Sequence, residues 1–234
     1  MNNSAIAKIV CVFNEKGGAG KTTTTCQLAG TLGERGYDVL VADLDTQQTS
    51  SAWMAQNGGV DFKATSWAGF RYGANLTQKI QELSGKYDII IADCAPSVEQ
   101  ATTWGMLLVS DLALIPTRLS PPDLNALPTA KRLARKATEA AGREIKTRVV
   151  ANATRMHMRD AKEYFQSLEA DKEIPPMKTT LSDLKAYERS MLFGSTAHAV
   201  QGGEKAVAEI ERLTDEVLQL LNLPKMVKKN DNQT

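Results

Sequence analysis

The sequence predicts a single α/β domain with a doubly wound, mostly parallel β-sheet that carries helices on both faces. Short apolar runs of strand length alternate along the chain with helical stretches. These runs lack a regular alternation with polar residues, which is typical of strands buried on both faces of a parallel sheet. With 234 residues, 42% of them hydrophobic, the chain is long enough for one large domain with a sizeable core. We expect this domain to span residues 1–222, followed by a polar tail at residues 223–234.

The expected elements begin in the order strand, helix, strand. Residues 6–13 are apolar and β-rich and predict the first strand, and residues 22–35 predict a helix. Gly36 lies where a glycine commonly ends a helix, because glycine tolerates the left-handed conformation found there. The last helix is expected over residues 204–221, where apolar residues recur with helical spacing. Further apolar runs predict strands at residues 39–44, 87–92, 112–116 and 148–151.

Composition and charge exclude few classes of function. The formal net charge is +1, so any surface that binds nucleic acid has to be local. The three cysteines, Cys11, Cys26 and Cys94, have no metal-ligand spacing and are typical of a reducing compartment, which favours a cytoplasmic location. The sequence contains no run of 18 consecutive apolar residues, so we expect no transmembrane helix.

A glycine-rich segment, KGGAGKT at residues 16–22, joins the first expected strand to the first expected helix. Its glycines let backbone N–H groups approach phosphate oxygens, and the N-terminus of the following helix favours negative charge. The ammonium of Lys21 would bridge the β- and γ-phosphates of a triphosphate, and the hydroxyl of Thr22 would bind Mg²⁺. The predicted nucleotide-binding residues here are Gly17, Gly18, Ala19, Gly20, Lys21, Thr22 and Thr23.

Carboxylates follow two expected strands at their carboxyl ends, which face the ligand crevice of a doubly wound sheet. Asp43 and Asp45 lie at the end of the second strand, and Asp93 follows a run of four apolar residues. An aspartate after such a run commonly holds Mg²⁺. We therefore predict Thr22, Asp43 and Asp93 as metal-binding residues. A strand-end pair of aspartates that caps a turn is the alternative for both Asp43 and Asp45.

These motifs resemble those of the ParA/MinD superfamily of ATPases. KGGAGKT is similar to the deviant Walker A motif of that family, KGGxGKT, in which Lys16 is the early lysine. Residues 43–47, DLDTQ, resemble its DxDPQ motif with Thr46 in place of proline, and residues 93–97, DCAPS, resemble D-x-P-P-S with Ala95 in place of proline. Residues 116–123 resemble the ParA pattern P-x-x-x-S-P-x-D, and the whole resemblance covers roughly residues 6–222.

The resemblance implies a P-loop ATPase that uses ATP and Mg²⁺ and forms a homodimer around two ATP molecules. It assigns Lys16 to the partner's nucleotide and Asp45 to the attacking water, so the expected catalytic residues are Lys16, Lys21 and Asp45. It also assigns Asn152, at the end of a strand, to the adenine edge. A strand-end asparagine turn remains the alternative for that residue.

Within the superfamily the chain looks like the short plasmid partition ATPases, which have no helix-turn-helix ahead of the P-loop. This resemblance implies a DNA-segregation ATPase whose ATP-bound dimer binds DNA without sequence preference. A ParB-like centromere-binding partner would stimulate its hydrolysis. We therefore expect a cytoplasmic protein that associates with the nucleoid when ATP is bound.

Other members of the superfamily provide the alternatives. A partition-like ATPase that positions a cargo other than a plasmid fits the same motifs. A MinD-like membrane-cycling ATPase needs a cationic amphipathic helix at its C-terminus, whereas residues 204–221 carry five acidic and two basic residues. We therefore expect no membrane partner. A reductase similar to the nitrogenase iron protein needs a second cysteine after Cys94, and none follows.

Basic residues concentrate in residues 131–148, which carry seven cationic and two acidic side chains. Because the whole chain has a net charge of only +1, this concentration predicts a local surface for the DNA backbone. A solvated helix face is the alternative, and the tail lysines Lys225, Lys228 and Lys229 form a competing patch. The residues predicted to contact DNA are Lys131, Arg132, Arg135 and Lys136.

Overall fold

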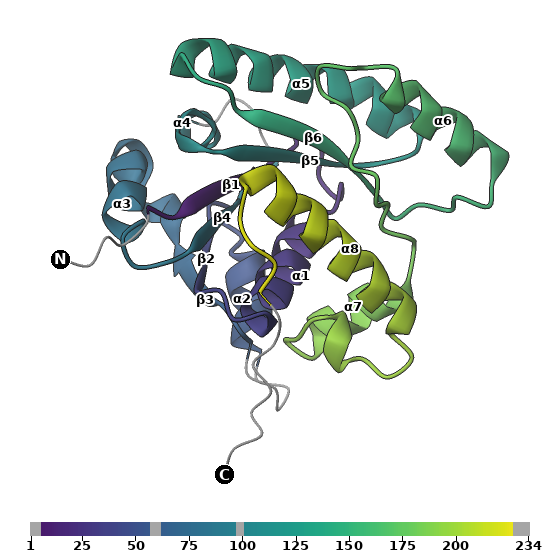
Figure 1. Ribbon diagram of the computed structural model, residues 1–234, viewed down its shortest axis with the longest axis horizontal. Helices are drawn as coiled ribbons and strands as arrows, with labels where there is room; N and C mark the ends of the chain where they lie inside the picture. The colour runs from purple at the N-terminus through teal and green to yellow at the C-terminus, as the bar shows by residue number, and fades with distance from the viewer. Residues whose placement is uncertain (1–5, 57–61, 97–100, 227–234) are drawn as a thin grey trace.

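The computed structural model describes residues 6–56, 62–96 and 101–226 (Figure 1). Ser97 of the DCAPS motif and the tail from residue 227, including Lys228 and Lys229, lie outside the described residues. In chain order the elements are β1 (Lys8–Val12), α1 (Lys21–Glu34), β2 (Val39–Asp43), α2 (Thr49–Ala55), β3 (Thr65–Ala68), η1 (Gly69–Asn75), α3 (Leu76–Leu83), β4 (Ile89–Asp93), α4 (Ala101–Val109), β5 (Leu112–Arg118), α5 (Pro121–Ala141), β6 (Lys146–Asn152), α6 (Arg159–Glu169), α7 (Lys185–Leu192), η2 (Ala197–Ala199) and α8 (Glu204–Leu221).

The described strands form one parallel sheet in the order β3-β2-β4-β1-β5-β6. The chain first moves from β1 towards β2 on one side and later crosses to β5 on the other, so the strand order reverses beside β1. Ligands of such sheets bind outside the carboxyl ends of the strands at this point. The pairing places Asp93 level with both Val12 and Asp43, at that same edge.

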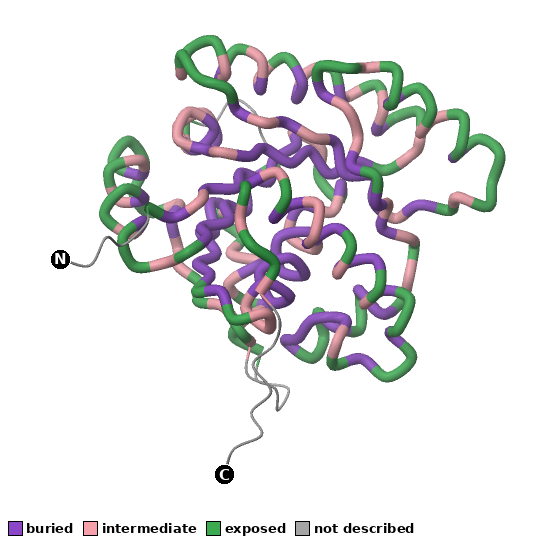
Figure 2. The backbone as a smooth tube through the Cα atoms, viewed as in Figure 1, coloured by how far each residue is buried: buried purple, intermediate pink, exposed green. Residues whose placement is uncertain are grey.

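Hydrophobic cores lie on both faces of the sheet. Helices α1 and α8 cover one face, and α3, α4 and α5 cover the other (Figure 1). In β4, Ile89 and Ile91 pack into the first core, whereas Ile90 packs into the second. Successive side chains of a strand point to opposite faces, so an unbroken apolar run is what a strand covered on both faces requires. Figure 2 shows the central strands as almost continuously buried.

The predicted fold class is confirmed, and the strand prediction was incomplete. Strand β3 was missed because it contains no apolar run. It forms one edge of the sheet beside β2, and its residues are exposed or half-buried. Strand β6 begins at Lys146, so the end of the basic segment at residues 131–148 belongs to the sheet and only its beginning belongs to helix α5.

Helix α8 is fastened to the domain through its acidic side chains. Arg35, immediately after α1, pairs with Glu211 and Asp215. Glu209 and Glu216 accept hydrogen bonds from the segment that precedes α7. These acidic side chains therefore make ion pairs and hydrogen bonds that hold α8 against the rest of the domain. In the part of the chain that the structure describes, no helix is long and apolar enough to cross a membrane.

Candidate functional site

The loop between β1 and α1 depends on glycines in the left-handed conformation. Gly18 has φ 72° and Gly20 has φ 97°, values that other residues rarely adopt. A Cβ atom on Gly20 would lie 1.5 Å from Nδ2 of Asn152, so the site has no room for a side chain there. Helix α1 begins at Lys21, and its unpaired N–H groups and dipole point into the loop. The loop is therefore shaped for an anionic ligand.

The Lys21 side chain is folded back over this loop. Its Nζ donates a hydrogen bond to the carbonyl of Lys16 at 3.2 Å, and the residue is buried. Burial lowers the pKa of Lys21, and the nearby carboxylate of Asp93 opposes that shift. A buried ammonium beside a row of N–H groups provides an electrostatic site for phosphate oxygens.

Thr22 and Asp93 form the second component of the site. The hydroxyl of Thr22 donates to Oδ2 of Asp93 at 2.8 Å. Oδ1 of Asp93 is buried and has no hydrogen-bond partner among the described residues, and burial raises the pKa of Asp93 to about 7. An unpartnered buried carboxylate oxygen beside a hydroxyl fits a divalent cation such as Mg²⁺, which takes oxygen ligands from one or two side chains and from phosphates. Across the described residues, no cluster of three or more His, Cys, Asp or Glu forms a metal site by itself.

Asp43 lies beside Asp93 but is engaged with the backbone. Its Oδ1 accepts from the N–H of Asp45 at 3.1 Å, and its Oδ2 accepts from the N–H of Ser51 at 2.9 Å. The side chain is fully buried and fastens the turn between β2 and α2. These contacts favour the turn-capping alternative for Asp43 over the predicted role as a metal ligand.

Asp45 occupies the turn that Asp43 fastens. It is only partly buried, and its carboxylate accepts from the N–H of Gln47 at 2.9 Å. Asp45 lines the same cavity as the glycine-rich loop, so its carboxylate has access to a ligand and to water. The structure thus brings Asp45 together with Lys21 and Thr22, as the resemblance implies.

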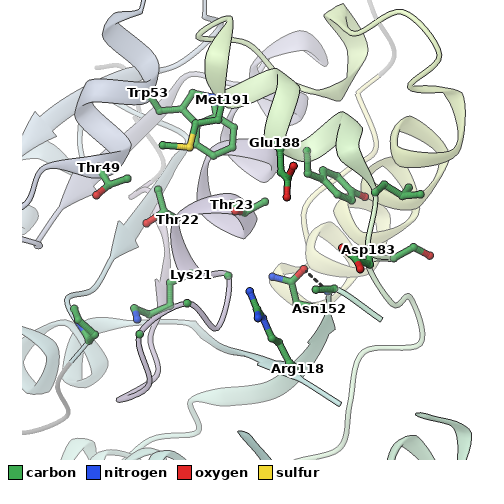
Figure 3. A pocket seen from close by; sticks show the side chains of 18 of the residues that line it. Lys21, Thr22, Thr23, Thr49, Trp53, Arg118, Asn152, Asp183, Glu188 and Met191 are labelled. Carbon is green, nitrogen blue, oxygen red and sulfur yellow. Dashed lines mark hydrogen bonds between the residues drawn. The ribbon is translucent and has the colours of Figure 1, made fainter. Parts of the chain in front are cut away.

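The glycine-rich loop forms one wall of a cavity of about 430 Å³ (Figure 3). Asn152 and Arg118, at the ends of β6 and β5, lie at a second wall. The Asn152 amide donates to the carbonyl of Ala19 at 3.3 Å and accepts from the N–H of Ala153 at 2.8 Å. Asn152 therefore fastens the loop to β6, and its predicted contact with adenine stays a prediction.

A third wall of the cavity was missed by the sequence analysis. It is formed by α7 and the residues before it, where the motif resemblance is loose. Trp53 of α2 adds an apolar surface, and its indole N–H donates to the carbonyl of Ser195 at 2.9 Å. Arg118 could have been found because it ends a strand at the crevice, whereas α7 carries no motif. The lining residues that were missed include Trp53, Arg118, Asp183, Tyr187, Glu188 and Met191.

Lys16 does not line this cavity. Its Nζ pairs with Oδ1 of Asp123 at 3.0 Å, in the first turn of α5. Asp123 is buried and also accepts a hydrogen bond from the hydroxyl of Ser120. Within a single chain the ammonium of Lys16 is therefore paired with Asp123, outside the cavity that Lys21 and Thr22 line, although the Lys16 carbonyl contacts Lys21.

The predicted DNA-binding helix is partly neutralised by acids that lie far along the sequence. Lys131 is buried and pairs with Asp171 at 2.7 Å, and Arg135 pairs with Glu173 at 2.6 Å. The count over residues 131–148 did not include these two acids. A buried and paired Lys131 is poorly placed to contact a phosphate backbone, and its predicted contact with DNA stays a prediction. Arg132 and Lys136 are exposed.

Comparison with known proteins places the whole chain in one family. A model of the CobQ/CobB/MinD/ParA nucleotide-binding domain matches residues 10–229. A maintenance of carboxysome distribution protein A from Gloeobacter kilaueensis is 28% identical over 221 residues, which cover 92% of this chain and 96% of that protein. A plasmid-partitioning protein ParA from Thermus thermophilus is 22% identical, and the match covers 92% of this chain and 79% of that protein.

Solved structures share the fold. An ATP complex of a McdA variant from Cyanothece has a TM-score of 0.76 at 15% identity, covering 95% of this chain and 99% of that chain. MinD from Pyrococcus horikoshii with Mg-ADP has a TM-score of 0.71 at 20% identity, covering 92% and 97%. Because the family model extends over nearly the whole chain, the chain belongs to the CobQ/CobB/MinD/ParA family of nucleotide-binding domains.

Proposed function

We propose that this chain is a ParA-type ATPase that binds ATP with Mg²⁺, dimerises around two nucleotides and segregates DNA, in the first instance a plasmid. The observation that carries the proposal is the hydrogen bond between the half-buried Thr22 and the buried Asp93. Thr22 and Lys21 line the cavity, and the Asp93 carboxylate behind Thr22 has one oxygen without a hydrogen-bond partner among the described residues. Structures of relatives with ATP and with Mg-ADP support the same choice of ligand.

Each residue then has a defined task. Thr22 and Asp93 would hold Mg²⁺, which neutralises phosphate charge when bound. Lys21 would leave the carbonyl of Lys16 to contact the phosphates. Asp45, partly exposed at the mouth of the cavity, would orient the attacking water. A ParB-like partner would then accelerate hydrolysis and release the dimer from DNA.

Dimerisation requires Lys16 to exchange partners. The ion pair between Lys16 and Asp123 has to open before this ammonium can reach a nucleotide on a second chain. The side chain of Lys16 is one-third exposed, and among the described residues its ion-pair partner is Asp123. The negative charge of a triphosphate would replace that of the carboxylate.

Sedimentation velocity with no nucleotide, ADP or ATP, each with Mg²⁺, tests this proposal. We expect a monomer without ATP and a dimer with ATP. Lys16→Ala should remove the ATP-dependent dimer and leave the binding of a fluorescent ATP analogue nearly unchanged. Lys79→Ala, which removes a lysine paired with Glu82 on the surface of α3, is the matched control and should behave like wild type. A wild-type chain that stays monomeric with ATP would refute the dimer, and a normal dimer of Lys16→Ala would remove Lys16 from it.

A second candidate function differs only in cargo. The carboxysome distribution relative matches almost the full length of both proteins, which favours an ATPase that positions a protein assembly along DNA. Deleting the chain's gene separates the two candidates. Faster loss of a plasmid from growing cells supports plasmid segregation, whereas stable plasmids with a clustered protein assembly support the other cargo.

A further inference from the structure

Residues of helix α7 line two different cavities. Tyr187, Glu188 and Met191 line the nucleotide cavity, and Figure 3 shows Glu188 and Met191 at its edge. Lys185 and Arg189 are four residues apart, which places them on a common face of the helix. Both of these basic residues are exposed, and neither lines the nucleotide cavity.

The basic face of α7 borders a small second cavity. This cavity, of about 160 Å³, lies between α7, the segment around Gly202 and the beginning of α8. Lys205 of α8 completes its cationic lining, which contains no acidic residue from the described part of the chain. We call the three cationic residues Lys185, Arg189 and Lys205 the basic cleft.

The charges of the basic cleft are largely uncompensated. Within the described residues, Lys185 and Arg189 form no ion pair, and Lys205 approaches only Glu209, at 3.9 Å. Glu209 is itself buried and accepts hydrogen bonds from Ser182. The exposed Glu204 precedes Lys205 but does not line the cavity.

This arrangement contrasts with the basic segment of α5. There, Lys131 and Arg135 are already paired with Asp171 and Glu173. A phosphate that binds at Lys131 or Arg135 would have to displace these carboxylates, whereas a phosphate in the basic cleft would not. The concave shape and converging cations of the cleft therefore suit a polyanion better.

We propose that the basic cleft binds the phosphate backbone of DNA, and that α7 transmits the state of the nucleotide cavity to it. This inference rests on the proposed function and locates its DNA contact. A ligand that contacts Glu188 and Met191 fixes α7, and the same helix then holds Lys185 and Arg189 in place. A dimer presents two clefts to one duplex, so DNA binding depends on ATP.

The test compares two triple variants by fluorescence anisotropy on a duplex of random sequence, with a non-hydrolysable ATP analogue and a range of salt concentrations. One variant carries Lys185→Gln, Arg189→Gln and Lys205→Gln. The matched control removes the same charge from the sequence-predicted surface through Arg132→Gln, Lys136→Gln and Arg143→Gln, all at exposed positions.

We expect the cleft variant to lose at least tenfold in DNA affinity and the control to stay within about twofold of wild type. The slope of log affinity against log salt should fall by about 2.7 per protomer, since each lost phosphate contact accounts for about 0.9. Equal losses in both variants, or wild-type affinity in the cleft variant, would overturn the inference.

Two further readouts separate the causes of failure. Sedimentation should show that the cleft variant is still a dimer with ATP. If it is not, the test is repeated with Lys205→Gln alone, which lies on α8 away from the nucleotide cavity. The slope of log affinity against log salt should then change by about 0.9. A wild-type chain that dimerises but binds no DNA refutes the DNA part of the proposed function together with this inference. Unchanged amide exchange in α7 on adding the ATP analogue would refute the transmission through that helix.

A membrane is the competing polyanion, because the exposed Leu192 and Phe193 follow the basic face of α7. Membrane binding is tested by flotation with vesicles that contain phosphatidylglycerol, with and without the ATP analogue. We expect wild type to remain unbound to the vesicles under conditions in which it binds DNA. Vesicle binding that the cleft substitutions abolish, without any DNA binding by wild type, would assign the cleft to lipid headgroups and overturn the inference.

Discussion

Replacement of Asp93 by asparagine tests the electrostatics of the site directly. Burial raises the pKa of this carboxyl from 3.8 to about 7. In the unfolded chain Asp93 has its ordinary pKa, so the folded chain holds this proton more tightly than the unfolded chain does. Raising the pH from 3.8 to about 7 therefore progressively destabilises the folded state. Above about pH 7 the stability that the Asp93 proton contributes is completely lost.

The size of the effect follows from the separation of the two pKa values. They differ by about three pH units, and each unit corresponds to about 1.4 kcal/mol. The wild-type chain therefore loses about 4 kcal/mol of unfolding free energy through Asp93 by pH 8, and about 1.5 kcal/mol by pH 5. Asp93→Asn keeps the shape of the side chain and remains neutral. Its stability advantage should grow from about 1.5 kcal/mol at pH 5 to about 4 kcal/mol at pH 8.

Urea denaturation of the nucleotide-free chain in the absence of Mg²⁺, at pH 5, 6, 7 and 8, measures this difference. Asp45→Asn makes the same chemical change at a more accessible position in the site and is the matched control. Adding ATP and Mg²⁺ at pH 8 should stabilise wild type but not Asp93→Asn. A stability difference between Asp93→Asn and wild type that does not change with pH would refute the reasoning.

Three further substitutions test the loop and the turn beside it. Lys21→Ala should abolish the binding of a fluorescent ATP analogue, since it removes the buried ammonium; near-normal affinity would contradict its assignment to the phosphates. Asp45→Ala should bind ATP and dimerise but release phosphate at least tenfold more slowly, and an unchanged rate would reassign the water-orienting role. Gly20→Ala should lose about 2 kcal/mol or more of stability in thermal denaturation, because φ is 97° and the new Cβ would overlap the Asn152 amide. Adding Asn152→Ala to Gly20→Ala should restore only the part of the lost stability that is due to the overlap with the Asn152 amide.

The sequence alone was sufficient for the fold class and for the position of the glycine-rich loop in the sheet. Apolar runs and glycine spacing are local properties of the sequence. Few other sequence patterns can form strands that are buried on both faces, or a loop whose backbone can surround an anion. Residues 16–22 and Asp93 were placed correctly at the carboxyl edge of the sheet for this reason. The edge strand β3 was not found, because a half-exposed strand needs no apolar run.

Only the tertiary structure decided which charges are free. Lys131 and Arg135 looked available in the sequence until the fold brought Asp171 and Glu173 against them. Conversely, Lys185, Arg189 and Lys205 converge although two helices and a connecting segment contribute to their cleft. The attraction between two charges depends on the distance between them in space and weakens steeply beyond a few ångströms in water. The number of residues that separate them along the chain does not determine this distance. The motifs of this protein were therefore readable from its sequence, whereas its candidate surface for a partner required the fold.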